Sequence, residues 1–353
     1  MISSHRVAIR AVPGSKGSGL YCTTRTKVGH LAITQICLMR IVNILCDGGL
    51  GNRLNALIGG LILAEDLQAR AKIFWPNNNW CGCSYGDLFA VDLDVSNQGL
   101  RHVFGINPDS AFLIHVNQLK TPLKTVLNQT QESWALLRTR DADVVYYHDS
   151  IPTWITRDRI LKTLGSIPIR SEIAEKASDF CARNRIDAST WGLYFRMTDY
   201  SAHPLFKKDL AEIHRYVSVD KGARYYVCSD DQGTEDAFNA LDNVCALPKT
   251  SYVQKYRPGG WNDLIIDDEG RESNFNVNRP RQSVIEAFIG LLILSRTTLA
   301  FDSPSTFLAY AKLYSNFNWN TNRLRPFWQR WLRQKLPSGP RQFRIRKKLR
   351  SLL

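Results

Sequence analysis

Short apolar runs alternate with amphipathic segments along most of the chain, which is the pattern of α/β proteins. Residues 40–46 (RIVNILC) form a run rich in β-branched residues and predict a buried strand. A glycine loop at 47–51 follows, and residues 52–70 then carry leucine and isoleucine at helical spacing. The run KIFW at 72–75 predicts the next strand. This order of strand, helix and strand predicts a parallel sheet with right-handed crossovers.

The alternation continues to about residue 313 and forms two series. The first predicts further strands at 112–116 and 144–147. The second begins after Pro168 and predicts helices at about 171–185, 210–217, 231–241, 283–294 and 305–313, and strands at 191–196, 223–228, 244–247 and 299–301. Residues 249–282 are rich in Gly, Asn and Pro and predict a long loop. Two doubly wound units in tandem place ligand sites in the crevice between them.

The length of 353 residues also favours two domains, since one domain typically holds roughly 150 residues. We expect an N-terminal Rossmann-like domain at 39–168 and a C-terminal Rossmann-like domain at 169–320. A tail at 1–38, with little core of its own, and a basic amphipathic segment at 321–353 flank them. No stretch reaches the roughly 18 apolar residues that a membrane-spanning helix needs.

The formal net charge of +14 comes from the two ends of the chain. Residues 1–38 and those after Asp302 hold 17 of the 46 Lys and Arg and no acidic residue. The 29 bases left in between stand against all 32 acids. A nucleic-acid-binding protein would carry its positive charge on the folded body, so we expect no nucleic-acid partner.

The basic C-terminal segment interleaves Arg and Lys with aromatic and aliphatic residues, which is the composition of an interfacial helix. We expect residues up to about Leu336 to pack on the first domain, and residues 340–353 to meet an anionic membrane surface. The eight cysteines are scattered, without paired CxxC motifs, which argues against a structural zinc site and favours reduced thiols. These features predict a cytoplasmic protein, peripheral on the inner face of the membrane.

The glycine loop after the first strand is the first candidate for binding. Its glycines let a ligand approach the backbone, and the helix that follows offers an N-terminus suited to anions. A dinucleotide-binding fingerprint would need Gly or Ala at Leu54 and an acid after the second strand, and has neither. A turn needed only for packing remains an alternative. The predicted loop facing the cleft consists of Gly48, Gly49, Gly51, Asn52 and Arg53.

Three polar motifs stand where predicted strands of the second series end. In residues 194–199 (YFRMTD), Arg196 can bind a phosphate through two hydrogen bonds, and Asp199 can orient the guanidinium. Residues 228–231 (CSDD) follow the next strand. In residues 301–307 (FDSPSTF), Ser305 and Thr306 can cap the helix and donate to phosphate. Each motif alone is more often a surface pair or a plain cap.

Two pairs of aspartates match the short DxD pattern that binds a divalent metal in some glycosyltransferases. They are Asp92 with Asp94 and Asp141 with Asp143. Neither follows a convincing strand of a nucleotide-binding unit, and the seven histidines show no metal-binding spacing. We therefore assign no metal.

Taken in order over residues 40–316, the motifs resemble the superfamily of α1,2-, α1,6- and protein O-fucosyltransferases. The N-terminal part is most similar to the rhizobial nodulation α1,6-fucosyltransferases. The family motif HxRxxD has Tyr194 in place of its histidine, and Gly290 stands where an aspartate usually contacts guanine. The matching residues are Arg196, Asp199, Ser229, Asp230, Asp231, Ser305, Thr306 and Phe307.

The resemblance implies a GT-B architecture, in which two Rossmann-like domains face a cleft. The domain at 39–168 would then lie on the acceptor side, and the domain at 169–320 would bind the nucleotide sugar. It further implies GDP-fucose as donor, inversion at the anomeric carbon, no metal and no other cofactor, and a glycan or lipid-linked glycan as acceptor. Arg196 would be the catalytic residue, bound to the β-phosphate. Glu286, one turn before Gly290, is the candidate residue for contacting the guanine base. The implied donor-binding residues are Asp199, Asp230, Asp231, Ser305, Thr306, Phe307 and Glu286. An inactive nucleotide- or glycan-binding protein, or a transferase for another nucleotide sugar, are the alternatives.

Overall fold

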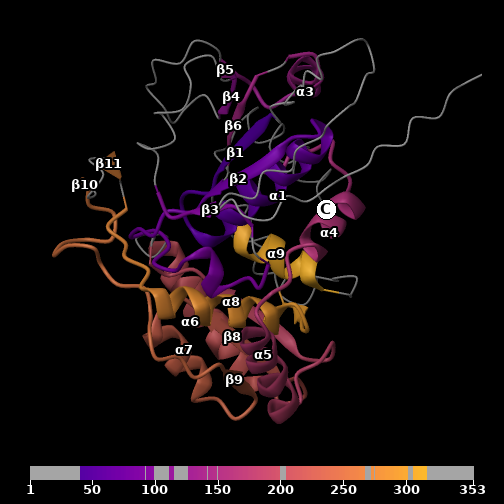
Figure 1. Ribbon diagram of the computed structural model, residues 1–353. Coiled ribbons are helices and arrows are strands. Elements are labelled where there is room, and N and C mark those ends of the chain that lie inside the picture. The colour runs from indigo at the N-terminus through magenta and orange to yellow at the C-terminus, as the bar shows by residue number, and fades with distance from the viewer. Residues whose placement is uncertain are drawn as a thin grey trace, which may run out of the picture.

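Figure 1 shows the computed structural model of the protein. It describes residues 40–91, 93–98, 111–114, 126–140, 142–148, 150–198, 204–266, 272–273, 275–300 and 305–315, without the side chains of 111–114, 204–209 and 272–273. The predicted tail, the basic C-terminal segment, Asp92, Asp141 and Asp199 lie outside these residues.

The N-terminal unit is a six-stranded sheet in which all neighbouring strands are parallel, in the order β3-β2-β1-β6-β4-β5. β1 lies inside the sheet, and its Val42 and Ile44 have no exposed surface, which explains why its residues are apolar except for the buried Asn43. The strands are β1 (Ile41–Leu45), β2 (Arg70–Phe74), β3 (Val95–Ser96), β4 (Ala111–Ile114), β5 (Val126–Leu127) and β6 (Val144–Tyr147). The helices are α1 (Leu50–Asp66), the 3-10 helix η1 (Tyr85–Asp87), α3 (Gln131–Arg138) and α4 (Arg157–Gly165).

The C-terminal unit is a second parallel sheet, in the order β12-β7-β8-β9. Its strands are β7 (Trp191–Phe195), β8 (Tyr225–Ser229), β9 (Val244–Ala246) and β12 (Thr298–Leu299). Its helices are α5 (Ser171–Asn184), α6 (Pro204–Val219), α7 (Gln232–Asn239), α8 (Arg281–Leu294) and α9 (Thr306–Tyr314). In Figure 1, α9 lies between the two units, next to α1 and α8.

The predicted α/β fold with two Rossmann-like units is confirmed, and most predicted elements lie within a few residues of the observed ones. The prediction of one long loop at 249–282 is wrong in part. Within it, β10 (Ile265–Ile266) and β11 (Glu272–Ser273) pair antiparallel. The sequence pattern also does not predict α3, α4, β3 or β5, because these elements are short and half-exposed, and so have weak periodicity.

Each sheet has one strand at which the chain reverses its direction of winding. From β1 the chain adds β2 and β3 on one side, while β6 lies on the other. From β7 it adds β8 and β9 on one side and returns to β12 on the other. In open parallel sheets, ligands bind at the carboxyl ends of the strands beside such a reversal. β1 leads into the glycine loop, and β7 ends at Phe195 with Arg196 directly after it, so the fold points to these two places.

One cluster of buried apolar side chains extends through both units. It includes Ile44 of β1 and Leu291 of α8. Phe89, in the N-terminal unit, contacts Phe288 of α8 edge-on, with ring centroids 5.7 Å apart. The units therefore share a core along one side of the molecule. Among the described residues, no helix is both long and apolar enough to cross a membrane.

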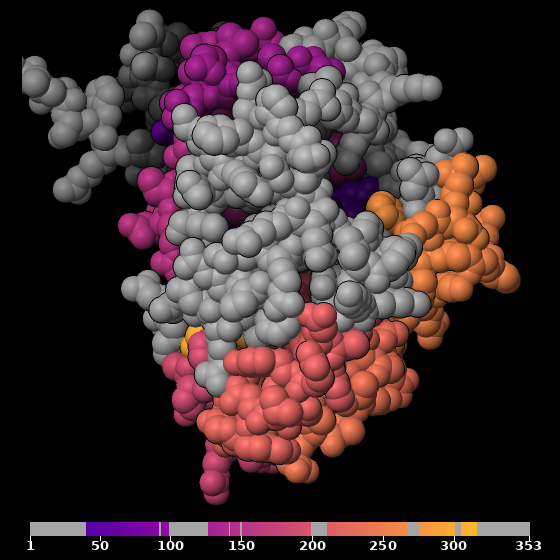
Figure 2. All heavy atoms as spheres, turned by 180° about the vertical axis from the view of Figure 1, so that it is seen from behind, coloured from indigo at the N-terminus to yellow at the C-terminus, as the bar shows by residue number. Residues whose placement is uncertain are grey.

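Polar contacts join the units beside this core. The Gly82 amide donates to the Arg279 carbonyl at 2.9 Å, and the Arg279 amide donates to the Asn79 carbonyl at 2.8 Å. Arg281, the first residue of α8, donates to Asp87 of η1 at 2.7 Å. Figure 2 shows the orange part of the chain, which leads from β9 to α8, rising along one flank of the molecule toward the indigo N-terminal unit.

The ion pair between Asp87 and Arg281 predicts a pH effect on stability. Burial alone would raise the pKa of Asp87, but hydrogen bonds from Arg281 and Ser84 outweigh it and hold this pKa below the ordinary 3.8. The folded protein thus binds this proton less tightly than the unfolded chain. The pair stabilises the fold above the ordinary carboxyl pKa, and this contribution is lost as the pH falls through the lower, folded pKa.

We therefore expect Asp87→Asn to lose less stability than the wild type between about pH 5 and about pH 2. The difference should stay below about 1 kcal/mol, because the Arg281 side chain is 61% exposed. Urea denaturation across this range measures it. Asp242→Asn is the control, since the side chain of Asp242 is 94% exposed. Parallel acid limbs for Asp87→Asn and the wild type would contradict the assigned shift.

Candidate active site

The glycine loop after β1 is held by the buried carboxylate of Asp47. One of its oxygens accepts hydrogen bonds from the Gly48 amide at 2.8 Å and from the Asn78 side chain at 3.0 Å. Gly48 has a φ of +79°, a conformation in which other residues are strained. Asn78 follows β2, so this contact joins the loops after two neighbouring strands at the carboxyl edge of the sheet.

The buried side chain of Arg53 stabilises the same loop. Its side chain has no exposed surface and donates to the Gly48 carbonyl at 2.8 Å, the Pro76 carbonyl at 2.6 Å and the Asn78 side chain at 2.9 Å. The guanidinium also lies over the ring of Trp75, 5.2 Å from its centroid. Arg53 thus belongs to the predicted loop, and its guanidinium is already engaged within the protein.

The first turns of α1 and α9 touch each other. A β-carbon at Gly51 would lie 2.4 Å from the Thr306 hydroxyl, so only glycine allows this approach. The Thr306 hydroxyl donates to the Asn52 side chain at 3.3 Å, and one turn on, Tyr310 donates to Asn55 at 2.9 Å. The predicted cleft loop and the predicted hydroxyl-rich turn are therefore in direct contact, although they belong to different units.

This contact brings two helix N-termini together. Neither α1 nor α9 has an acidic residue in its first turn or a hydrogen bond from a capping side chain. The expected cap by Ser305 is therefore not formed: Ser305 occupies the N-cap position, but its hydroxyl accepts no amide of the helix. The partial positive charges of both helix ends are therefore not offset by a carboxylate or a capping side chain of their own helices.

Tyr194, which stands at the position of the family's histidine, packs against α9. Its ring is stacked on that of Phe307, with centroids 4.8 Å apart and an angle of 15° between the planes. Burial raises the pKa of Tyr194 well above its ordinary value; the charge of Asp230 raises it further, while that of Arg196 acts in the opposite direction. Tyr194 is thus a neutral phenol, close to both charged groups.

Arg196 is the first residue after β7, at the strand where the winding reverses, and its side chain is half-buried. The next residues are fixed by Asp230, whose two oxygens accept from the Met197 amide and from the Thr198 hydroxyl, both at 2.6 Å. Asp230 thus joins the end of β8 to the end of β7. Its carboxylate positions the segment that carries Arg196.

Asp231 is the N-cap residue of α7. Its side chain caps α7 by accepting hydrogen bonds from the Thr234 amide and hydroxyl, both at 2.8 Å. Donor binding by Asp231 stays a prediction, and the cap already uses one of its oxygens.

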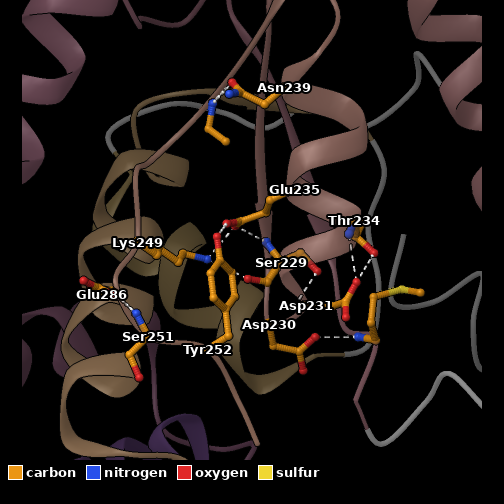
Figure 3. Close-up of polar contacts among 12 residues, drawn as sticks. Ser229, Asp230, Asp231, Thr234, Glu235, Asn239, Lys249, Ser251, Tyr252 and Glu286 are labelled. Carbon is orange, nitrogen blue, oxygen red and sulfur yellow. Dashed lines mark hydrogen bonds and ion pairs between the residues drawn. The ribbon is translucent and has the colours of Figure 1, made fainter.

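A buried network of hydrogen bonds lies behind β8, and none of the predicted motifs includes its central residue, Glu235. Figure 3 shows Ser229, Lys249 and Tyr252 converging on Glu235. Glu235 accepts from the Ser229 amide at 2.7 Å, from Lys249 at 2.5 Å and from the Tyr252 hydroxyl at 2.8 Å. Lys249 also donates to the Ser229 carbonyl at 2.6 Å. The network therefore binds both backbone polar groups of Ser229, the residue before Asp230. The only local signal is an acid at helical spacing from the buried Phe238.

Glu286 holds the loop after β9. Its carboxylate accepts from the Thr250 amide and hydroxyl, the Ser251 amide and the Gln282 side chain, at 2.8 to 3.1 Å. At Gly290, a β-carbon would lie 2.9 Å from the Cys228 sulfur, so an aspartate there would have no room. A base-contacting role for Glu286 stays a prediction, and its carboxylate is already engaged by the protein.

The described members of the two DxD pairs serve the N-terminal sheet. Asp94 accepts from Arg70 at 2.7 Å, and Asp143 accepts from the Ile41 amide at 2.9 Å. Within the described residues, no three His, Cys, Asp or Glu side chains lie where they could hold a metal ion.

The fold and this site define a GT-B protein, with two Rossmann-like units whose strand ends meet at α1 and α9. The solved structure of fucosyltransferase NodZ from Bradyrhizobium is similar, with a TM-score of 0.50 and 16% identity over 78% of this chain and 92% of that one. At this identity the likeness establishes the fold that the chain shares with the fucosyltransferases, and not the reaction.

Two further structures were found. NodZ α-1,6-fucosyltransferase soaked with GDP-fucose has a TM-score of 0.49 and 16% identity, over 78% of this chain and 93% of that one. POFUT1 in complex with GDP-fucose has a TM-score of 0.42 and 13% identity, over the same shares. The sequence matches no protein-family model and no curated protein.

The buried position of Arg53 predicts that it is needed for stability. Arg53→Lys keeps the charge but cannot reach the three acceptors that the guanidinium holds, so buried acceptors are left without donors. We expect a loss on the order of 3 kcal/mol in the free energy of unfolding, measured by urea denaturation. The control is Arg70→Lys, in an exposed pair with Asp94, which should change stability by less than about 0.5 kcal/mol. Equal effects for the two variants would contradict the assigned role.

Proposed function

We propose that the protein is an inverting, metal-independent glycosyltransferase that transfers fucose from GDP-fucose to a hydroxyl of a glycan. The observation that carries this proposal is the contact between the α1 and α9 N-termini, with α9 stacked through Phe307 on Tyr194 of β7, the strand that Arg196 directly follows. Arg196 and both N-termini favour an anion, and the crevice where a parallel sheet reverses its winding is where nucleotides bind.

The reaction needs this positive charge. The bond between the anomeric carbon and the diphosphate oxygen breaks, and the negative charge grows on the leaving GDP while the sugar becomes oxocarbenium-like. The acceptor hydroxyl attacks from the opposite face and loses its proton. A guanidinium remains charged at any working pH and can bind the β-phosphate through two hydrogen bonds, which stabilises the leaving group in the transition state. Asp230 keeps Arg196 in place through Met197 and Thr198.

Recognition of the guanine base is a separate point from binding of the diphosphate. No side chain fits at Gly290, and Glu286 binds the loop after β9. These observations support the two alternatives, which are a transferase for another nucleotide sugar and an inactive protein that binds a nucleotide or a glycan. Melting temperatures with GDP, GDP-fucose and the corresponding UDP compounds distinguish the nucleotides, because a ligand stabilises the folded state that binds it. A membrane contact of residues 340–353 remains a separate proposal.

Replacing Arg196 tests the central role. Arg196→Lys keeps the charge but loses the second hydrogen bond, so we expect donor hydrolysis to slow by roughly 10²-fold with an unchanged melting temperature. Release of GDP from GDP-fucose is the measurement, since it needs no acceptor. Arg183→Lys, exposed on α5, is the matched control. A variant with more than about half of the wild-type rate would remove Arg196 from this role, and a wild type without hydrolysis would favour the binding protein.

The second test concerns metal ions. The proposal assigns the stabilising charge to Arg196 and two helix ends, so donor hydrolysis should continue at the same rate after treatment with EDTA. Activity that disappears with EDTA and returns with Mg²⁺ or Mn²⁺ would contradict this part of the proposal. The Asp92 and Asp141 pairs would then be the first residues to replace.

A further inference from the structure

A cluster of aromatic and basic side chains lies where the two units meet beside the candidate site. Trp80 follows β2, and Phe275 and Arg279 precede α8. Trp80 and Phe275 are in edge contact, with centroids 5.8 Å apart and an angle of 81°, and the Arg279 guanidinium lies 5.6 Å from the centroid of Trp80. We propose that this cluster binds a neutral oligosaccharide, as a subsite for the acceptor. This rests on the proposed transfer to a glycan.

The topology places the cluster on the ligand side of both sheets. Trp80 belongs to the loop at the carboxyl end of β2. The chain from Phe275 to Arg279 leads into the N-terminus of α8, and α8 runs back to the start of β12, which is parallel to β7. The cluster therefore lies at the carboxyl edge of the C-terminal sheet as well. In parallel sheets this edge is the one that binds ligands.

Hydrogen bonds connect the cluster to the glycine loop. The Trp80 amide donates to the Asn78 side chain at 3.1 Å, and Asn78 in turn donates to Asp47 at 3.0 Å. Asp47 also accepts from the Gly48 amide, so three hydrogen bonds in series join Trp80 to Gly48, and an acceptor chain resting on Trp80 would run toward the crevice that we assign to the donor.

The segment that carries Phe275 is built to hold its shape. We call the described residues 254–266 and 275–280 the arm; it is the orange segment on the flank in Figure 2. Asn276, without exposed surface, exchanges hydrogen bonds of 2.8 Å with the Arg257 backbone and donates to the Gly260 carbonyl at 3.1 Å. Gln254 and Asn278 pair through their backbones. The arm thus presents its side chains on a fixed frame.

The chemistry of the cluster fits a sugar. The C–H face of a pyranose ring is apolar and packs on aromatic rings, while its hydroxyls accept hydrogen bonds from a guanidinium. Phe275 is 39% exposed although it is a large apolar residue. The arm repeats the combination twice, with Lys255 over Trp261 at 5.7 Å and Arg257 over Tyr256 at 5.3 Å. Aromatic rings combined with a few directed donors are typical of small-molecule sites.

Saturation-transfer NMR on the full chain tests the subsite without any donor. The probes are tetrasaccharides of β-linked glucose, β-linked N-acetylglucosamine, β-linked galactose and α-linked mannose. We expect at least one to bind, and Phe275→Ala to weaken this binding about tenfold, since exposed aromatic anchors carry much of the affinity of an interface. Trp80→Leu should have at least the same effect. Melting temperatures show whether the variants fold.

Leu264→Ala is the matched control, because Leu264 is an apolar residue of the same arm that is 62% exposed and lies outside the cluster. It should leave binding unchanged. Absence of binding to all four probes would overturn the proposal, and so would an equal effect of Leu264→Ala and Phe275→Ala. Because GDP-fucose is absent, a protein that binds the probes through Phe275 but never hydrolyses the donor supports the subsite and refutes the transferase.

Discussion

The close approach of α9 to α1 is the constraint on which the arrangement of the site depends. Thr306 touches the backbone of Gly51, and no larger residue fits at that position. The contact joins the start of the first helix of one unit to the start of the last described helix of the other. It thereby brings the reversal points of both sheets into one place, and the stack of Tyr194 on Phe307 fixes α9 on the end of β7.

Much of the fold could be predicted from the sequence, because local pattern decides it. The buried strands β1 and β7 are mainly apolar runs of five residues each. Loops rich in glycine or serine follow the strand ends that face the crevice. The candidate residues Gly51, Arg196, Asp230 and Thr306 therefore could be placed at strand ends in advance. Short elements such as β3 could not be predicted, since two half-buried residues have no periodicity.

The roles of individual side chains could not be predicted, because they depend on contacts between distant segments. Arg53 is in a loop motif that favours a ligand, yet its acceptors come from residues 76 and 78 as well as from the loop. Ser305 has the right place and chemistry for a cap but does not form one. Glu235 finds its cation, Lys249, beyond β9. Residue types and spacing identify groups that can bind, and only tertiary structure shows which are already occupied.

The shared core has a consequence for how the molecule moves. Because Phe89 and Phe288 belong to one apolar cluster, a hinge that separates the two sheets would expose the surface between them to water. That cost disfavours wide opening as the route by which a nucleotide enters or leaves. Small molecules would then enter and leave the crevice through local shifts of its loops. Heat or denaturant should disrupt both units in one cooperative transition, because the apolar cluster between them belongs to both.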